Sequence, residues 1–445
     1  MNIIFYSICY LSFLLILGVI IRSKVKIFQE LFIPASVIGG VVGLIIGNFI
    51  IPIEWIKEIR MFPGLLIIPI VTSIPLGFNF KNKNSKSKGK DVILMTGIML
   101  MVTFFQLFIG YFINFFFEKI GGIKLYKSFG SELNSGLSGG HGTAGMIGRV
   151  LKELNMEYWY LAQGIATVIA TFGLIGGIVL GIFLINKNSK NGKITFFLEN
   201  NNINEELKKG YIKDIERQPS LGRETLFPSL LDTLAFHIAI IFSVCGLSYL
   251  LLNFIKAKKI PILSSFSVWI FGMGIMFVVW SIIKNRGLEW CIDVKVKSKI
   301  SGFLTEFAIV SAVSTLQLNI ITTYFFPIFL MISLGFLGTW FIIKYYSYKV
   351  FLNNYSFERA IAMLGTCLGI FFTGLLLLKI CDPEFSTPVL GDYSLGFSFS
   401  ALLGPLLITN FTVLAINYNA MVPMITSLIF FIILIFIMKI VDSKK

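Results

Sequence analysis

Long apolar segments alternate with short polar ones along almost the whole chain. Several of them, such as residues 93–117, contain the roughly 20 residues that a helix needs to cross about 30 Å of hydrocarbon. They are apolar on every face, whereas the helices of a large soluble domain carry a polar face toward water. The pattern therefore predicts an all-α polytopic membrane protein whose outer surface contacts the lipid bilayer.

The apolar segments predict five spanning helices in the first half of the chain and six in the second half. The first segment follows no basic stretch and precedes no small-residue cleavage site, so we expect a retained helix and not a signal peptide. The polar residues 186–229 predict a flexible linker with one short surface helix near residues 204–214. The expected spans are residues 3–21, 33–52, 62–80, 92–117, 158–185, 231–253, 260–283, 300–317, 322–347, 398–416 and 421–440.

Two landmarks recur at one spacing and indicate an internal duplication. Ile33-Pro34 and Ile260-Pro261 each open an apolar segment 227 residues apart, and Gly142 and Gly369, in two further polar segments, have the same spacing. We therefore expect two five-helix repeats, each with a re-entrant hairpin, followed by an extra C-terminal helix. The expected division is residues 1–185 with a hairpin at about 131–157, the linker 186–229, and residues 230–445 with a hairpin at about 355–380.

The basic residues indicate how the helices are oriented. If each hairpin returns to its own side, the loops on one side carry 27 of the 38 lysines and arginines, and the loops on the opposite side carry eight. Loops rich in positive charge stay in the cytoplasm. This predicts a protein of the cytoplasmic (inner) membrane with its N-terminus outside, its C-terminus inside, and repeats of inverted orientation. The loops also account for the net charge of +15, so we expect no nucleic-acid partner.

The most distinctive polar stretch lies between the fourth and fifth expected helices. Six glycines fall within residues 136–148, and the run Ser138-Gly139-Gly140-His141-Gly142-Thr143 contains one of the two histidines of the chain. Such backbone forms helices poorly, and at membrane depth it must be buried in protein or line a wet cavity. At the tip of a re-entrant hairpin, the returning helix would direct free N–H groups at an anion such as a carboxylate. An extracellular loop with turn glycines is the alternative.

Other polar residues in the expected helices are candidates for ion handling or for packing. Glu306 is an ionisable group at expected membrane depth, which favours a role with ions or protons. His237 with Asp232 could form a relay, although hydrogen bonding between helices is the commoner role of such residues. The five cysteines lack metal-binding spacing and are expected to pack as small apolar residues. The oxygens that we expect to ligate Na⁺ belong to Thr167, Thr171, Thr409 and Asn410.

An intramembrane hydrolase is a second functional hypothesis, with Ser138 as nucleophile and His141 as base. The run that holds them contains no acidic residue to orient the imidazole, and the chain has no His-Glu-x-x-His zinc motif. A channel is a third hypothesis, but two inverted discontinuous elements favour alternating access over a continuous pore. We therefore expect a transporter and not an enzyme.

The glycine-rich run and its surroundings resemble a known family. The run 138–143, the following Arg149, and Ala170-Thr171-Phe172-Gly173-Leu174 with Gly176-Gly177 look like the bacterial sodium/glutamate symporters, and residues 33–40 are similar to that family's second-helix motif. The resemblance implies a homodimer that imports glutamate or a related acidic amino acid with Na⁺ as the coupling ion, without an organic cofactor, by an elevator-like shift. The residues placed in substrate binding are Ser138, Gly139, Gly140, His141, Gly142, Thr143, Gly365, Thr366, Gly369 and Thr373.

The second half departs from the family pattern. Family members carry a Gly-His-Cys-Gly-like second tip and a later Thr-Pro-Thr, whereas this chain has Gly365-Thr366-Cys367-Leu368-Gly369 and then Phe372-Thr373-Gly374-Leu375. Half of the substrate site is therefore expected to differ from that of the family. A transporter of a different organic anion is the alternative that follows from this departure.

Overall fold

The computed structural model describes residues 3–31, 33–50, 52–77, 89–121, 125–189, 209, 211–212, 214–218, 220–258, 268–316, 322–352, 354–382 and 387–443. This part of the chain consists of helices and turns, and eight of its helices are long and apolar enough to cross a membrane. The prediction of an all-helical, multi-pass membrane protein is confirmed.

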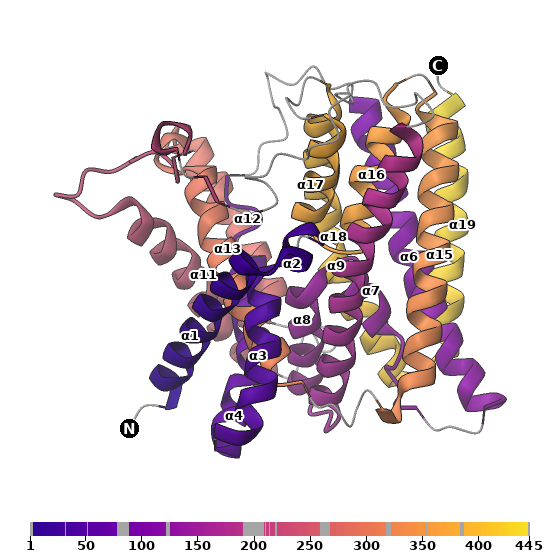
Figure 1. The fold of residues 1–445 in the computed structure, drawn as a ribbon, viewed down its shortest axis with the longest axis horizontal. Coiled ribbons are helices and arrows are strands. Elements are labelled where there is room, and N and C mark those ends of the chain that lie inside the picture. Colours follow the sequence, from indigo (N-terminus) through magenta and orange to yellow (C-terminus); the bar gives the residue numbers. More distant parts are fainter. Residues whose placement is uncertain are drawn as a thin grey trace.

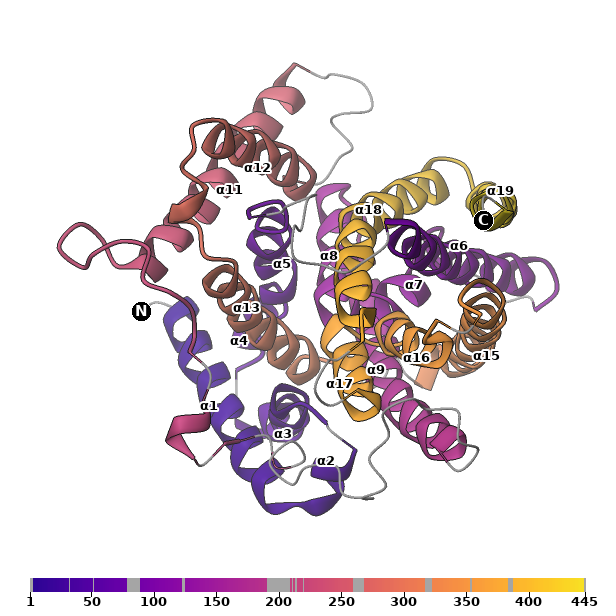
Figure 2. The same cartoon turned by 90° about the horizontal axis from the view of Figure 1, so that it is seen from above.

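The helices form two bundles that stand side by side in Figure 1 and in the view from above in Figure 2. The elements of the first bundle are α1 (Ile3–Lys24), α2 (Lys26–Glu30), α3 (Ala35–Ile50), α4 (Ile53–Ile59), α5 (Phe62–Thr72), α11 (Thr233–Ala257), α12 (Val268–Asn285), α13 (Val294–Ser314) and the 3₁₀ turns η1 (Ile215–Arg217) and η3 (Glu289–Cys291). Within it, α13 packs against α3 and α5, and α5 also contacts α11 and α12.

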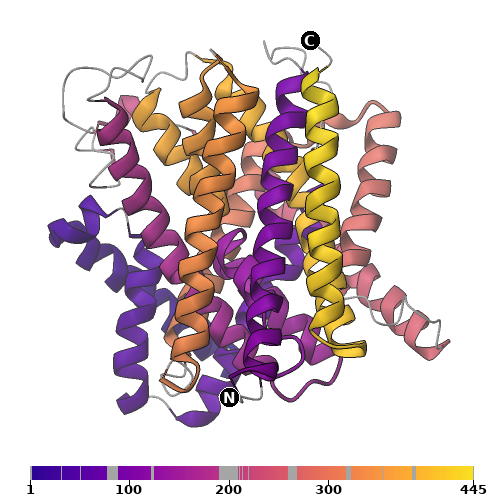
Figure 3. The same cartoon turned by 90° about the vertical axis from the view of Figure 1, so that its right-hand side faces the viewer.

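The second bundle contains the glycine-rich segments. Its elements are α6 (Gly89–Lys119), α7 (Ser131–Leu137), α8 (Gly140–Glu153), α9 (Trp159–Ser189), α15 (Phe325–Val350), α16 (Ser356–Cys367), α17 (Phe371–Cys381), α18 (Val389–Asn417) and α19 (Met421–Ser443). Figure 3 shows α15, α6 and α19 side by side on its outer face, and α6 packs against both of the others. The short helices α7, α8, α16 and α17 lie behind them.

The bundles meet where α8 packs on α5. A Cβ built on Gly145 would lie 2.6 Å from the Pro63 carbonyl oxygen, so a larger residue at this position would push the helices apart. Small residues allow membrane helices to approach this closely. One turn along α8, the Arg149 guanidinium donates to the Tyr249 hydroxyl of α11 at 3.1 Å. The second bundle is therefore held against the first through the hairpin that carries the glycine-rich run.

Most expected spans match helices, but the expected span 62–80 is wrong in its second half, because α5 ends at Thr72 and residues 73–77 form turns. Two helices, α13 and α18, begin well before the hydropathy indicated. α13 begins at Val294 because Asp293 caps it, accepting hydrogen bonds from the backbone N–H groups of Lys295 and Val296. α18 begins at Val389, directly after Pro388, although we expected its span to begin at residue 398. The expected spans of 62–80, 260–283 and 300–317, and the expected surface helix at 204–214, lie partly outside the described residues.

His237 serves packing and not a relay. The Asp293 N–H donates to His237 Nε2 at 2.9 Å, so the ring proton lies on Nδ1, which donates to the Thr233 carbonyl at 2.7 Å. Asp232 caps α11 through the Ala235 N–H. Although burial alone would raise the pKa of the Asp293 carboxyl, hydrogen bonds from the backbone and from Arg223 hold it below its ordinary value.

The cysteines match the expectation of packing residues. Four of the five are buried, and Cys9 is exposed.

Candidate functional site

Helices α7 and α8 form the first hairpin, whose tip is the turn Ser138-Gly139. α8 begins at Gly140, whose φ of +64° is a left-handed conformation that glycine adopts without strain. The base of the hairpin is held by Asn114 of α6, whose side-chain amide donates to three backbone carbonyls within residues 126–129.

Helices α16 and α17 form the second hairpin, whose tip is Leu368-Gly369-Ile370. At its base, the fully buried Arg359 guanidinium pairs with Asp392 of α18 at 2.6 Å and with Asp91 of α6 at 3.3 Å. Both hairpins are therefore anchored to α6 through buried polar side chains.

The two hairpins contact α6 from its opposite ends. Asp91, in the first turn of α6, contacts the base of the second hairpin, and Asn114, near the other end, contacts the base of the first. These two residues are separated by about 35 Å of helix at 1.5 Å per residue. Gln106 lies between them and contacts both tips, so the tips meet beside the middle of α6.

Gln106 is the polar centre of this arrangement. Its fully buried side chain accepts hydrogen bonds at Oε1 from Asn134 (2.8 Å) and from Ser138 (2.7 Å) of the first hairpin. Its Nε2 donates to the Cys367 carbonyl of the second hairpin and to the Thr339 hydroxyl of α15, both at 3.0 Å. One amide thus joins both tips and a neighbouring helix.

The tips also touch each other directly. The Ser138 hydroxyl reaches the Cys367 carbonyl at 3.3 Å. A Cβ built on Gly140 would lie 2.6 Å from Cγ2 of Ile370, and one built on Gly173 of α9 would lie 2.6 Å from the Leu368 carbonyl oxygen. Glycine at these two positions therefore allows the second tip to sit against the first hairpin and against α9.

His141 is buried in the first turn of α8 and presents one ring nitrogen without a partner. Its Nε2 lies 3.0 Å from the Thr171 hydroxyl, which donates its only proton to the Thr167 carbonyl. Thr171 must therefore accept from His141, which places the ring proton on Nε2. Among the described residues, Nδ1 has no hydrogen-bond partner and remains a buried acceptor.

The other residues predicted in the first hairpin shape the tip. The Thr143 hydroxyl bonds to the carbonyls of Ser135 and Gly140, which ties the first turn of α8 to α7. A Cβ on Gly139 would overlap the Thr143 side chain, and one on Gly142 would lie 3.4 Å from Ile67 of α5. Gly142 therefore faces the first bundle, whereas Ser138 faces the second tip.

The residues predicted in the second hairpin lie along the contact between its two helices. A Cβ on Gly365 would lie 2.7 Å from the backbone of Gly374, so the helices touch there. The Thr366 hydroxyl bonds within α16 and to Tyr393 of α18, and Thr373 is buried in the first turn of α17 beside Gly369. Of these residues, Gly369 lies at the tip, and Thr366 joins the hairpin to α18 through its hydrogen bond with Tyr393.

The expected sodium ligands lie in two helices, α9 and α18. Thr167 and Thr171 lie in α9 beside His141. In α18, the Thr409 hydroxyl is buried and has no partner among the described residues, whereas Asn410 is exposed and donates to a carbonyl of its own helix. Glu306 is exposed on α13 of the first bundle and so lies away from the buried contact between the tips.

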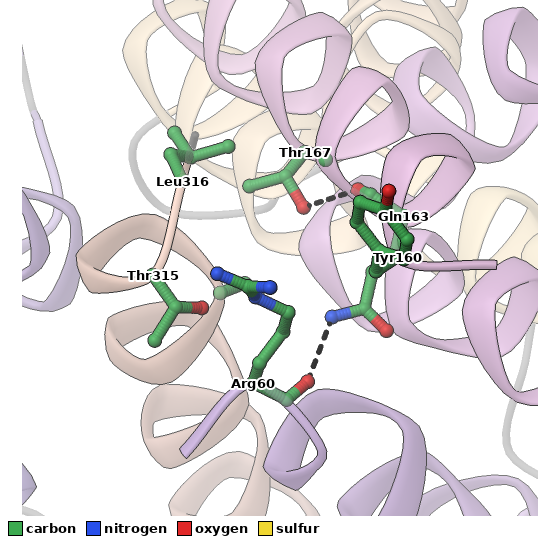
Figure 4. A pocket seen from close by; sticks show the side chains of 8 residues that line it. Arg60, Tyr160, Gln163, Thr167, Thr315 and Leu316 are labelled. Carbon is green, nitrogen blue, oxygen red and sulfur yellow. Dashed lines mark hydrogen bonds between the residues drawn. The ribbon is translucent and has the colours of Figure 1, made fainter. Parts of the chain in front are cut away.

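A pocket opens between the bundles next to α9. Its lining includes Arg60, which follows α4, and Gln163 and Thr167 of α9. Figure 4 shows the Arg60 side chain extending into this pocket between Thr315 and Gln163. The guanidinium also lies 5.9 Å from the centre of the Tyr160 ring. Because the hydroxyl of Thr171 bonds to the carbonyl of Thr167, the pocket is one helical turn from the threonine that holds His141.

A sequence model of the family described as sodium/glutamate symporter matches residues 2–369. The chain belongs to the sodium/glutamate symporter family. It is a sodium-coupled secondary transporter and not an enzyme, and the resemblance seen in the sequence is confirmed. The match ends at the second tip, so α17, α18 and α19 follow the matched segment.

Comparison with curated proteins gives no match. Among solved structures, the symporter is similar to the sodium proton antiporter MjNhaP1 from Methanocaldococcus jannaschii at pH 8, with 16% identity and a TM-score of 0.40. The alignment covers 92% of this chain and 100% of that chain.

The local geometry also explains why the hydrolase hypothesis is wrong. Ser138 is the centre of the sequence Gly136-Leu137-Ser138-Gly139-Gly140, which fits a Gly-x-Ser-x-Gly pattern, but it lies in a turn between two helices. Its hydroxyl bonds to Gln106 and Cys367, and His141 bonds to Thr171. Serine and histidine therefore hold separate partners and do not form a nucleophile–base pair.

Sequence reasoning missed Gln106, Asn114 and the Arg359–Asp392 pair. Each is a polar residue within or next to an apolar segment, which is a signal that could have drawn attention to it. The partners of Gln106 were not predictable, because they lie up to 261 residues away in the chain.

Proposed function

We propose that the symporter imports glutamate or a related acidic amino acid together with Na⁺, and that it binds this substrate between the two hairpin tips. The single observation that carries the proposal is the meeting of both tips at Gln106, beside a buried His141 with an unpaired acceptor. Polar backbone and unpaired polar atoms at such depth require a polar occupant or a wet cavity.

The chemistry of the two helix ends suits a carboxylate. α8 and α17 both begin at the tips, at Gly140 and Phe371. The first backbone N–H groups of a helix lack partners within the helix, and the helix dipole adds partial positive charge there. A substrate carboxylate placed between the tips would accept from these groups and from the Ser138 hydroxyl.

His141 suits the ammonium group of an amino acid. With its proton on Nε2, the ring presents Nδ1 as an acceptor, and the ammonium group carries three donors. Sodium prefers oxygen ligands, as other hard cations do. We assign it to the hydroxyls of Thr167, Thr171 and Thr409 and to nearby carbonyls, and we leave the exposed Asn410 out of this set.

The transport cycle that we propose uses the two bundles as separate bodies. Residues 1–185 and 230–445 would be inverted repeats joined by the linker 186–229, with the hairpins entering the membrane from opposite sides. The approach of the hairpins along α6 from its two ends supports this. The N-terminus would lie outside, the C-terminus inside the inner membrane, and the second bundle would move along the first within a homodimer.

Uptake by the purified protein in liposomes tests the proposal. The liposomes would contain K⁺, and radiolabelled glutamate, aspartate and a set of dicarboxylates would be offered with Na⁺ or with choline outside. We expect glutamate accumulation only with inward Na⁺. The variant His141→Gln should weaken apparent affinity for amino acids more than for dicarboxylates, because dicarboxylates lack the ammonium group.

An organic anion without an amino group is the second candidate substrate. The departure of the second tip from the family pattern favours it, since the apolar Ile370 stands beside the first tip and Leu368 stands beside α9. Sodium-driven uptake of a dicarboxylate in preference to glutamate would establish this alternative. Uptake that does not respond to Na⁺ would refute the symport mechanism itself.

A further inference from the structure

The base of the first hairpin holds a second buried polar site, centred on Glu132. This residue lies in the first turn of α7, and its side chain is fully buried. It is six residues from the tip and takes no part in the contacts between the tips. An ionisable group buried in a membrane protein is costly and commonly marks a functional site.

The described partners of the Glu132 carboxyl carry no positive charge. Oε1 accepts from the Tyr126 hydroxyl at 2.8 Å, and Oε2 accepts from the Gly130 N–H at 2.6 Å. No lysine, arginine or histidine in the described residues forms an ion pair with it. The nearest basic residue in sequence, Lys127, is exposed and donates to the Ile416 carbonyl. A carboxylate in this position would therefore lack a counter-charge.

Hydroxyl groups with unused hydrogen-bonding capacity surround this carboxyl. The hydroxyls of Tyr111, Tyr158 and Ser128 are buried, and none of them makes a hydrogen bond of standard geometry within the described residues. Ser128 lies beside the Tyr158 hydroxyl, and Ser131 and Thr412 lie beside that of Tyr111. Tyr111 of α6 and Tyr158 both lie within electrostatic reach of Glu132. An acidic O–H needs an acceptor, and a neutral hydroxyl oxygen supplies one. The surroundings thus suit the protonated carboxyl better than the carboxylate.

The elements packed around Glu132 offer only neutral groups in the described structure. Tyr111 contributes from α6, Tyr158 from the turn before α9, and Tyr324, which lies near Tyr126, from the start of α15. Other hydroxyls near the site are those of Ser128, Ser131, Ser135 and Thr412.

We propose that Glu132 is a proton-binding site of the symporter, protonated in the conformation described here and deprotonated at another step of transport. When it releases its proton to water, the carboxylate remains and the Tyr126 and Gly130 hydrogen bonds stabilise it. The Tyr126 side chain is half-buried, and its hydroxyl donates to the Glu132 carboxyl. One side chain therefore separates Glu132 from the hairpin surface. The proposal rests on the transport function and adds a proton to it.

The same hairpin links this site to the tips. Glu132 lies at the start of α7, Asn134 lies in its middle, and Ser138 follows its end. Asn134 and Ser138 both donate to Gln106. A shift of α7 that follows loss of the proton would therefore reach the Gln106 contacts. This gives protonation a physical route to the proposed substrate site.

The test measures Na⁺-driven uptake in liposomes between about pH 5 and pH 9, a range that lies above the ordinary carboxyl pKa of about 4.3, so that an exposed carboxyl stays ionised throughout it. We expect a sigmoidal dependence in the wild type that flattens in Glu132→Gln, since glutamine mimics the protonated form. The matched control is Glu157→Gln, an exposed carboxyl in the turn before α9, which should leave the profile unchanged. A Glu132→Gln profile with the wild-type dependence would overturn the proposal.

Two further measurements keep the test decisive. If Glu132→Gln does not fold, Tyr126→Phe removes one hydrogen bond to the carboxyl, and a shifted midpoint supports the site whereas an unchanged midpoint refutes it. If the wild type shows no Na⁺-dependent uptake, the transport proposal fails by itself. Infrared spectra of the purified wild type and of Glu132→Gln are then compared. Loss of a protonated-carboxyl band in Glu132→Gln supports the site, and identical spectra of the two proteins refute it.

Discussion

Replacing Gln106 by leucine should weaken both the stability of the second bundle and substrate binding. Leucine keeps most of the volume but removes four hydrogen bonds, two at Oε1 and two at Nε2. At about 0.5–1.5 kcal/mol net per bond, this amounts to about 2–6 kcal/mol. Asn134 contributes most to the loss, because its buried amide would be left without its partner, whereas Ser138 keeps its bond to Cys367.

Part of this energy should appear in binding, because the lost bonds fix the two tips relative to each other. If about 2 kcal/mol is expressed in the position of the tips, apparent affinity falls about 30-fold. The assays are thermal unfolding in detergent and Na⁺-driven uptake at varied substrate concentration. Unfolding reports the loss in the bundle, and the KM for uptake reports the loss at the tips.

Thr103→Val is the matched control on the same helix. The Thr103 hydroxyl is buried, and within the described residues it bonds only to the Met99 carbonyl of its own helix, so its loss should change neither measurement much. The reasoning is refuted if Gln106→Leu unfolds at the wild-type temperature and transports with the wild-type KM. Loss of stability without any change in KM would place Gln106 in the fold alone.

Three further variants examine the remaining polar contacts. Arg60→Gln should raise the KM for an anionic substrate several-fold in uptake assays, whereas the exposed Lys57→Gln should not, since only Arg60 lines the pocket. Thr171→Val removes the acceptor for His141 and should weaken binding measured by isothermal titration about 5- to 150-fold, in line with about 1–3 kcal/mol for an unsatisfied buried group, and Thr171→Ser should retain it. Arg359→Met leaves Asp392 buried without its cation and should cost about 3–5 kcal/mol in unfolding experiments, part of which Arg359→Met with Asp392→Asn should restore.

The sequence predicts the spans and the place of the hairpins because both depend on local composition. Apolar length and glycine density can be read within a window of about 20 residues. The contacts that join the hairpins depend on residues far apart in the chain, such as Gln106 and Cys367. Single polar residues within apolar segments mark such contacts but do not identify their partners. The fold was therefore more predictable than the site.

The structure offers a second common spacing between the proposed repeats, besides the 227 residues found in the sequence. The sequence paired Gly142 with Gly369 at 227 residues, but in the structure Gly369 lies in the second tip, as Gly139 lies in the first. Those two glycines are 230 residues apart, and so are Trp159 and Val389, where α9 and α18 begin. This spacing, shared by two landmarks of the structure, supports the proposed duplication; of the landmarks found in the sequence, Ile260-Pro261 lies outside the described residues.

The spacing of 230 residues bears on what the second tip is expected to contribute. It pairs Thr143 with Thr373, and both threonines lie against a tip glycine, since Cβ atoms built on Gly139 and Gly369 would each come within 3.0 Å of the threonine hydroxyl. The same spacing pairs His141 with Phe371, whose ring stacks on Tyr393 at 4.9 Å. The second tip thus keeps the glycine and threonine that shape the turn but replaces the histidine by a packed aromatic ring. Polar side-chain recognition of the substrate should therefore come from the first tip, and the second should supply backbone groups and an apolar wall.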